Sequence, residues 1–262
     1  MGIISFNTTG KDSLGWRLGN QMFQYASLLG IARKNDMTPY FNIENTYLNK
    51  CFKLGGVEDK VLAEHHHQLF DGSPSFNSSF FQLPNQHNFD INGYLQTPKY
   101  FEHCKSEIKK EFEFQDSIKE NAVKALPKDK LVSIHVRRTD YLNKPDYHTN
   151  LQIDYYRNAL EHFDGHAPIV FSDDIDWCKE NLSDLAETVY FSETPPADGN
   201  SGVYVDLCMM TLCDAHIIAN SSFSWWGSYL GGGKTVAPKR WNGPDGPQDF
   251  QDIYLSDWII CD

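Results

Sequence analysis

The chain has 262 residues, of which 40% are hydrophobic and 14% aromatic, enough for one large folded domain or two of ordinary size. Its net charge of −12 at pH 7 argues against a general affinity for nucleic acid or anionic membranes, so an anionic ligand would need a local basic site. The six cysteines show no C-x-x-C pair or regular spacing, and we expect reduced thiols of a cytosolic protein.

The first residues carry no basic leader, and no segment approaches the ~20 apolar residues that a membrane helix needs. These features predict a cytoplasmic protein without an integral membrane segment. Residues 2–7 are typical of a strand, and the apolar spacing over residues 20–35 predicts an amphipathic helix.

Gly19, Asn20 and Gln21 stand at the start of this helix. Glycine allows a close approach of the backbone to a ligand, and the two amide side chains can donate and accept hydrogen bonds. The segment is therefore a candidate binding site, although Asn20 could simply cap the helix.

Residues 39–42 predict a second short strand, and the region from residue 43 to 90 has so little periodicity that we expect loops with short elements. It contains His65-His66-His67, but consecutive residues of a regular element cannot converge on one metal ion. We interpret this triplet as a solvated loop. Two helices are expected next, over residues 101–114 and 116–125.

Beyond Pro127 strands and helices alternate regularly, which is typical of a parallel sheet covered by helices on both faces. Strands are predicted at residues 131–136, 168–171, 188–191, 216–219 and 235–237. Helices are predicted between them, at residues 153–163, 174–182, 203–212 and 223–230. This change in the predicted secondary-structure pattern divides the chain into an N-terminal domain, residues 1–126, and a C-terminal domain, residues 127–262.

The first strand of the C-terminal domain leads into His135-Val136-Arg137-Arg138-Thr139-Asp140-Tyr141. Open α/β sheets bind ligands where their strands end, and an arginine fork grips phosphate oxygens in two places at once. Because strand side chains alternate, His135 and Arg137 are expected on one side and Arg138 on the other. We expect Arg137 to meet an anionic ligand and Arg138 to brace the loop through a carboxylate such as Asp140. The alternative is a surface cluster of ion pairs.

Phe171-Ser172-Asp173-Asp174 stands where the next strand passes into a helix. One of its two aspartates can cap that helix. A second carboxylate could recognise guanine, because the base offers an N1–H and an amino group as adjacent donors. Asp174 and Asp176 also form a D-x-D pattern, which some sugar-nucleotide enzymes use to hold a divalent metal ion.

Asn220-Ser221-Ser222-Phe223-Ser224-Trp225-Trp226-Gly227 follows a later strand, at the start of a helix. Helix N-termini bind anions through free N–H groups, and serine hydroxyls add further donors. Simple capping by Ser222 or Ser224 is the alternative. We expect both: serines that face a phosphate, and Trp225 and Trp226 anchored in the core. No phosphate-binding G-x-x-x-x-G-K-[ST] or dinucleotide-binding G-x-G-x-x-G motif occurs.

The segments at residues 19–26, 135–141 and 220–227 occur together in the order and approximate spacing of the α-1,2-fucosyltransferases, glycosyltransferase family 11, which the chain resembles over nearly its whole length. The H-x-R-R motif also occurs in α-1,6-fucosyltransferases. The resemblance implies an α/β fold of the GT-B type, with two Rossmann-like domains and the active site in the interdomain cleft. The N-terminal domain would be on the acceptor side, and the C-terminal domain would bind the GDP-sugar.

The same resemblance implies metal-independent transfer of L-fucose from GDP-fucose to the 2-hydroxyl of a galactoside, with inversion at the anomeric carbon. Its partners would be GDP-fucose and a galactose-containing oligosaccharide or polysaccharide. Arg137 would hold the β-phosphate with the help of Arg138, and His135 with one of Asp173 or Asp174 would lie against guanine. The pyrophosphate would be lined by Ser221, Ser222, Phe223 and Ser224. From the N-terminal domain, Gly19, Asn20 and Gln21 would face the cleft.

Many family members carry glycine where this chain has Thr139. The α-1,6 enzymes accept threonine there, and a threonine requires only a negative φ. The base that deprotonates the acceptor is open between Asp140, Asp146 and His148. We rank Asp146 slightly ahead, since Asp140 could be structural. Residues 42–92 and Gly93-Tyr94-Leu95-Gln96 are expected to shape the acceptor site, where Phe80, Phe81 or Tyr94 could stack on sugar rings.

Two further hypotheses stay open. One is a metal-dependent sugar-nucleotide transferase that uses Asp174 and Asp176. The other is a non-catalytic module that binds a glycan or a nucleotide with the same scaffold.

Overall fold

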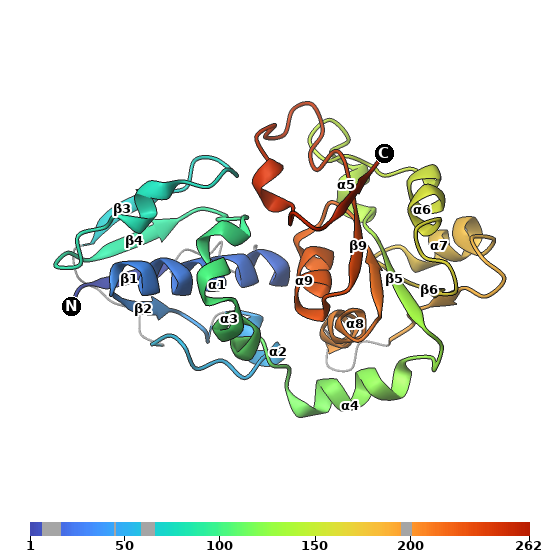
Figure 1. The fold of residues 1–262 in the computed structure, drawn as a ribbon, viewed down its shortest axis with the longest axis horizontal. Coiled ribbons are helices and arrows are strands. Elements are labelled where there is room, and N and C mark those ends of the chain that lie inside the picture. The colour runs from blue at the N-terminus through green and yellow to red at the C-terminus, as the bar shows by residue number, and fades with distance from the viewer. Residues whose placement is uncertain (7–16, 45, 59–65, 195–200) are drawn as a thin grey trace. The chain divides into compact units, whose positions relative to one another are not determined.

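The computed structural model describes residues 1–6, 17–44, 46–58, 66–194 and 201–262, and the chain divides into two compact units. Unit 1 comprises Met1–Gln115 and Asp249–Leu255, and unit 2 comprises Asp116–Gln248 and Ser256–Asp262 (Figure 1). The division falls before the helix at residues 116–125 instead of after residue 126, because that helix packs against a helix of unit 2.

Unit 1 is built on a four-stranded parallel sheet with the strand order β2-β1-β4-β3. Its strands are β1 Ile3–Phe6, β2 Thr38–Phe41, β3 His67–Phe70 and β4 Phe89–Asn92. Its α-helices are α1 Leu18–Asn35, α2 Leu48–Cys51 and α3 Lys105–Glu111, with 3₁₀ turns η2 Ser78–Phe81, η3 Pro98–Tyr100, η4 Glu102–Cys104 and η6 Gln251–Ile253. The first predicted strand, helix and second strand are confirmed as β1, α1 and β2, and residue 7 lies outside the described residues.

Helix α1 forms the centre of the unit 1 core and is buried on nearly all sides. A Cβ atom at Gly30 would lie 2.1 Å from the carbonyl oxygen of Tyr100. Only glycine therefore lets η3 pack this closely on the helix.

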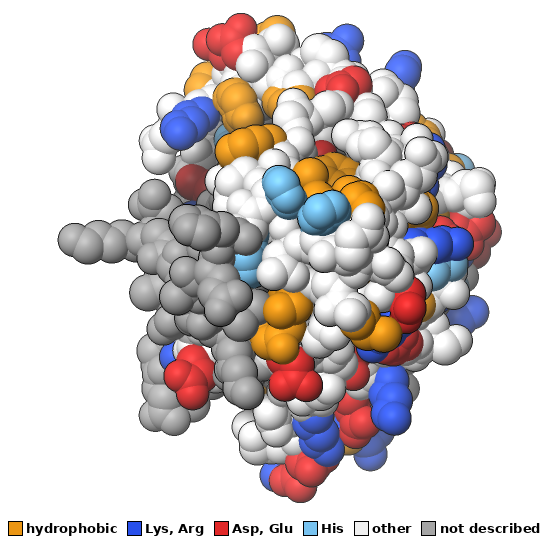
Figure 2. All heavy atoms as spheres, turned by 90° about the vertical axis from the view of Figure 1, so that its left-hand side faces the viewer, with side chains coloured by type: hydrophobic (Ala, Val, Ile, Leu, Met, Phe, Trp, Pro, Cys, Tyr) orange, Lys and Arg blue, Asp and Glu red, His pale blue; other side chains and the backbone are white. Residues whose placement is uncertain are grey.

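The region over residues 43–90 contains β3 and β4 as well as loops. His67 begins β3 instead of lying in a loop, and its exposed side chain meets the ring of His87 edge-on at a centroid distance of 5.4 Å. Figure 2 shows one face of unit 1, with histidine side chains near its middle and most charged side chains towards its margins. His65 lies outside the described residues.

Unit 2 carries a six-stranded parallel sheet with the order β10-β9-β8-β5-β6-β7. Its strands are β5 Leu131–Val136, β6 Ala167–Ser172, β7 Tyr190–Phe191, β8 Ala215–Ile217, β9 Lys234–Pro238 and β10 Ile259–Cys261. Its helices are α4 Asp116–Ala125, α5 Thr139–Leu142, α6 Ile153–Leu160, α7 Ile175–Leu182, α8 Ser201–Thr211 and α9 Ser222–Gly231. Figure 1 shows α6 and α7 on one face of the sheet and α8 and α9 on the other, as the alternating pattern predicts.

The six cysteines form no disulfide, and four of them are buried, as expected for reduced thiols. In the described ranges, no helix combines the length and the apolar character needed to cross a membrane.

Candidate functional site

The loop that follows β5 and carries Arg137 lies beside the loop that follows β6 and carries Asp173. β5 and β6 are neighbouring parallel strands, with His135 paired opposite Phe171 and Val136 opposite Ser172. Both strands therefore end at the same edge of the sheet. The loop that begins at Arg137 meets the loop that begins at Asp173 there, as the sequence predicts.

The Arg137 guanidinium is held by two carboxylates. Nη2 lies 2.6 Å from Oδ1 of Asp140, Nη1 lies 3.1 Å from Oδ2 of Asp173, and the group sits 5.6 Å from the centre of the Tyr141 ring. The side chain is 14% exposed. These contacts orient the fork at the sheet edge and leave other N–H donors of the guanidinium for a ligand.

Asp173 organises the start of α5. Its Oδ1 accepts the N–H of Arg138 at 2.9 Å, and its Oδ2 accepts the N–H of Thr139 at 3.2 Å and the Thr139 hydroxyl at 2.5 Å. The Thr139 hydroxyl thus supplies a bond that a glycine at this position could not make. Its φ is negative, as expected. The expectation that an aspartate side chain caps the following helix is wrong, because Asp174 is the N-cap residue of α7 without a side-chain bond to it.

Arg138 points to different partners from Arg137. Its Nε lies 3.0 Å from Oδ2 of Asp174, and its guanidinium stacks 3.6 Å from the centre of the Trp177 ring. The expected brace is therefore present, but through Asp174 instead of Asp140. The stack on Trp177 was not predicted; a tryptophan three residues after an acidic N-cap is its sequence signal.

His135 is a buried, neutral group on the α9 side of the sheet. Its ring lies 5.5 Å from that of Phe223, and it is 5% exposed. Burial lowers the pKa of His135 to about 4, and the nearby Asp173 charge opposes that shift. Within the part of the chain that is described, Nδ1 has no hydrogen-bond partner. A buried nitrogen without a partner is a candidate for a ligand contact.

The start of α9 is joined to the arginine loop. The Tyr141 hydroxyl donates to the carbonyl oxygen of Asn220 at 2.9 Å, and the Tyr141 ring stacks on His148 at 4.0 Å. Burial lowers the pKa of His148, an effect that Asp140 opposes. The Arg137, Asp173 and Asn220 segments therefore form one cluster.

Within the α9 segment the serines differ. Ser221 is the N-cap and accepts the N–H of Phe223, whereas Ser222 and Phe223 are half-buried. Ser224 is fully buried and donates to the carbonyl oxygens of Ala219 and Ser221, so its hydroxyl faces the backbone and not a phosphate as expected. The prediction that Trp225 and Trp226 belong to the core is confirmed.

The remaining predicted residues are placed as follows. In unit 1, Arg17 and not Asn20 is the N-cap of α1, which begins one residue before Gly19. Asn20 Oδ1 accepts a bond from Gln96 at 2.8 Å, and the buried Gln21 accepts the N–H of Tyr47 at 2.8 Å. In unit 2, Asp146 is exposed in a turn, where its carbonyl oxygen accepts the N–H of Asp245.

Asp174 and Asp176 do not form an obvious metal site. Asp174 is paired with Arg138, and residues two apart at a helix start do not face each other. No group of three or more His, Cys, Asp or Glu side chains that could hold a metal ion occurs in the ranges described above.

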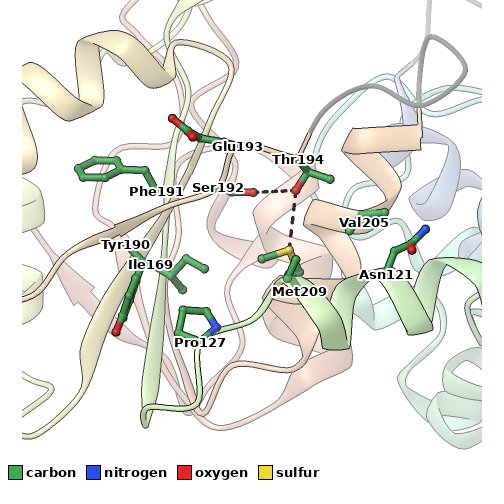
Figure 3. Close-up of a pocket in the computed structure, with 11 residues that line it drawn as sticks. Asn121, Pro127, Ile169, Tyr190, Phe191, Ser192, Glu193, Thr194, Val205 and Met209 are labelled. Atoms are coloured by element: carbon green, nitrogen blue, oxygen red, sulfur yellow. Dashed lines mark hydrogen bonds between the residues drawn. The ribbon is translucent and has the colours of Figure 1, made fainter.

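A cavity of about 540 Å³ lies elsewhere in unit 2, between β6, β7, α4 and α8. Figure 3 shows Ser192 and Thr194 pointing toward one another at its rim, above Met209 and Ile169. Both hydroxyls also bond to the half-buried carboxylate of Asp206, at 2.5 Å from Ser192 and 3.0 Å from Thr194. Burial raises the pKa of Asp206. None of the predicted site residues lines this cavity.

We expect the buried histidines to make the stability of unit 2 depend on pH. Burial lowers the pKa of His216, like that of His135, to about 4 from 6.5. The unfolded chain therefore binds more protons than the folded one between these values, and stability falls as the pH drops through that window. We expect the free energy of unfolding to fall by up to about 1.4 kcal/mol per pH unit for each histidine.

His216→Gln tests this expectation. The His216 ring bridges the Ser133 hydroxyl (2.8 Å) and the carbonyl oxygen of Gly232 (2.6 Å), so the variant is expected to be less stable at every pH. Its slope of unfolding free energy against pH should nevertheless be shallower than that of the wild type. Urea unfolding between about pH 7 and 5 measures both slopes, and equal slopes would contradict the assignment.

The chain resembles one family of glycosyltransferases over nearly its whole length. The sequence profile of Glycosyl transferase family 11 matches residues 7–262. Galactoside alpha-(1,2)-fucosyltransferase 1 of Rattus norvegicus is 27% identical over 94% of this chain and 70% of its own. An alpha-1,2-colitosyltransferase of Escherichia coli is 30% identical over 86% of this chain and 89% of its own.

Solved structures agree on the fold. The fucosyltransferase NodZ from Bradyrhizobium superposes with a TM-score of 0.58 at 12% identity, covering 87% of this chain and 93% of that one. FUT1 of Arabidopsis thaliana gives 0.56 at 10% identity, covering 90% of this chain and 70% of that one. This likeness confirms the expected α/β fold of the GT-B class. With the profile match over nearly its whole length, the chain belongs to glycosyl transferase family 11 and is a glycosyltransferase.

Proposed function

We propose that this glycosyltransferase moves L-fucose from GDP-fucose to the 2-hydroxyl of a galactoside, with inversion at the anomeric carbon and without a metal ion. The name of its relative in Rattus norvegicus supports the sugar, the acceptor and the α-1,2 linkage. The observation that carries the proposal is the Arg137 guanidinium, oriented at the sheet edge and linked through Tyr141 to the start of α9.

The chemistry needs positive charge beside the leaving group. As the bond between the anomeric carbon and the β-phosphate oxygen lengthens, positive charge grows on the sugar and negative charge on the diphosphate. The Arg137 guanidinium and the N–H groups at the start of α9 would stabilise the diphosphate where that charge appears. Arg138, held by Asp174 and Trp177, would keep the loop in position.

We assign the guanine contact to Asp174 instead of Asp173. Both oxygens of Asp173 already accept bonds from the arginine loop, whereas the Asp174 carboxylate meets the single Nε of Arg138. The unpartnered Nδ1 of His135 would supply a second contact to the nucleotide. Gly19, Asn20 and Gln21 of unit 1 would contact the acceptor. The free thiols support a cytoplasmic location for the protein.

Transfer of labelled fucose from GDP-fucose to a panel of galactosides tests the proposal, with the linkage read by NMR. We expect α-1,2 products and full activity in EDTA. Loss of activity in EDTA that Mn²⁺ restores would favour the metal-dependent alternative with Asp174 and Asp176. Calorimetric binding of GDP without any release of GDP from GDP-fucose would favour the non-catalytic module.

A second donor is supported by the colitosyltransferase of Escherichia coli, which is 30% identical to this chain. Colitose is L-fucose without its 3-hydroxyl, so both donors would present the same GDP group to the arginine loop. The ratio of kcat/KM for GDP-fucose and GDP-colitose measures the choice. A value well above one assigns fucose, and a value well below one assigns colitose.

A further inference from the structure

A half-buried carboxylate, Asp71, lies at the carboxyl edge of the unit 1 sheet. It directly follows β3, and its backbone N–H donates to the carbonyl oxygen of Asn92 at the end of β4 (2.9 Å). Its Oδ2 accepts the N–H of Leu95 at 2.8 Å. The structure gives this carboxylate no ion pair and no other hydrogen bond among the described residues, so Oδ1 has no protein partner there. Open α/β sheets bind ligands at this edge.

The loop that Asp71 holds is strained. Leu95 is fully buried with a φ of +51°, and Gly93 has a φ of +153°. A Cβ atom at Gly93 would lie 2.4 Å from the Cβ of Asp71, so glycine is required for this approach. Helix α1 fixes the loop, because Gln24 donates to the carbonyl oxygen of Gly93 and Ser27 to that of Leu95, each at 3.1 Å. Strain that the surrounding structure maintains in this way is concentrated at functional sites.

The surroundings of the loop suit a sugar. Tyr94 stands between the two strained residues with 51% of its surface exposed, and an aromatic face of this kind packs against the apolar face of a sugar ring. The amides of Gln96 and Asn20 are hydrogen-bonded to each other at 2.8 Å and offer further polar groups of unit 1. These residues include the segment for which the sequence predicts acceptor contacts.

Asp71 also has the electrostatics of a base. Burial raises the pKa of its carboxyl group to about 6 from 3.8, and the bond from the Leu95 N–H opposes the rise. A neighbouring titratable group is Tyr100, whose pKa is raised by burial and also by the charges of Asp71 and Asp252. Asp252 is itself paired with Lys99. A carboxylate with a pKa just below neutral is ionised at physiological pH and still accepts a proton readily.

We propose that Asp71 is the general base of the transfer, an assignment that rests on the proposed function. The acceptor hydroxyl donates its hydrogen bond to Oδ1. As the hydroxyl oxygen bonds to the anomeric carbon, the bond from that carbon to the β-phosphate oxygen breaks, and its electron pair leaves with GDP. The hydroxyl proton passes to Asp71, which later releases it to water. Asp140 is less suited to this role because it is paired with Arg137, and Asp146 is exposed in a turn.

Asp71→Asn separates this role from a purely structural one, because the amide oxygen can still accept the Leu95 N–H while the basic site is lost. We expect kcat/KM for the acceptor to fall by about a hundredfold or more, with an unchanged Kd for GDP. The wild-type kcat/KM should rise with pH to a plateau above about pH 6, and the variant should lose that rise. Asp71→Glu should restore part of the rate. Asp36→Asn, the same change at an exposed left-handed residue, should behave as the wild type.

Thermal stability gives an independent readout. Because the folded pKa of Asp71 is raised, its contribution to stability is full at low pH and is lost as the pH rises through about 6. Asp71→Asn is therefore expected to raise Tm at pH 7, where its activity is low, and to raise it less at pH 4.

Three outcomes would overturn the assignment. Wild-type kcat/KM and pH profile in Asp71→Asn would leave Asp71 as a clamp for the loop. Loss of the pH-dependent rise in Asp146→Asn instead would return the role to Asp146. Absence of transfer by the wild-type enzyme from any GDP-sugar would refute the proposed function itself, and this inference with it.

Discussion

Arg137→Ala is expected to lower kcat/KM for sugar transfer by about a hundred- to thousandfold, or roughly 3–4 kcal/mol of transition-state stabilisation. The reason is that Asp140 and Asp173 hold this guanidinium in a fixed orientation at the sheet edge, so its donors need no reorganisation when charge develops on the diphosphate. The variant should also bind GDP more weakly in calorimetry. Arg137→Lys keeps the charge without the planar fork and should recover only part of the rate.

Arg157→Ala is the matched control for this experiment. Arg157 belongs to the same unit and pairs with Asp184, but both side chains are about half exposed or more. Such surface pairs contribute little, so we expect wild-type turnover. A folded Arg137→Ala enzyme with wild-type kcat/KM would contradict the role of Arg137.

Asp173→Ala is expected to have the largest effect on stability of any site residue. Its side chain is 19% exposed, accepts three hydrogen bonds from the start of α5 and pairs with Arg137. Removing it breaks the bonds to the N–H groups of Arg138 and Thr139 and removes one carboxylate from the largely buried Arg137, which we expect to cost about 1–3 kcal/mol in the free energy of unfolding. Turnover should fall at least about tenfold, because Arg137 loses one of its two anchors.

Urea unfolding measures this loss, with Asp184→Ala as the control. That substitution removes an exposed carboxylate from an ion pair and should leave the free energy of unfolding nearly unchanged. An Asp173→Ala protein as stable as the Asp184→Ala protein would show that the arginine loop does not depend on Asp173.

Most elements of unit 2 could be predicted because its central strands are buried on both faces and read as apolar runs. β5 is buried at every position, so residues 131–136 stand out in the sequence. β3 could not be found in this way. It is an edge strand of four residues, most of them exposed, and His67 and Gln68 carry no apolar alternation. The short strand β10 and the single-turn helix α5 were missed for the same reason, a lack of periodicity over so few residues.

The meeting of the arginine and aspartate loops followed from topology, because neighbouring parallel strands end at one edge. Which side chains pair within the cluster could not be predicted from the topology. Which carboxylate meets Arg137 depends on side-chain rotamers and on the turn of α5, and these placed Asp140 with Arg137 and Asp174 with Arg138. Ser224 was misassigned because the helical turn directs its hydroxyl to the backbone. Asp71 carried no sequence signal, because the strand that precedes it was not predicted, and its burial and the strained Leu95 are visible only in three dimensions.

A crystal structure of the GDP complex tests the central claim most directly. We predict that the Arg137 guanidinium contacts a β-phosphate oxygen within hydrogen-bond distance, with the N–H groups at the start of α9 on the same diphosphate. A diphosphate bound elsewhere, with Arg137 still engaged only by Asp140 and Asp173, would contradict it.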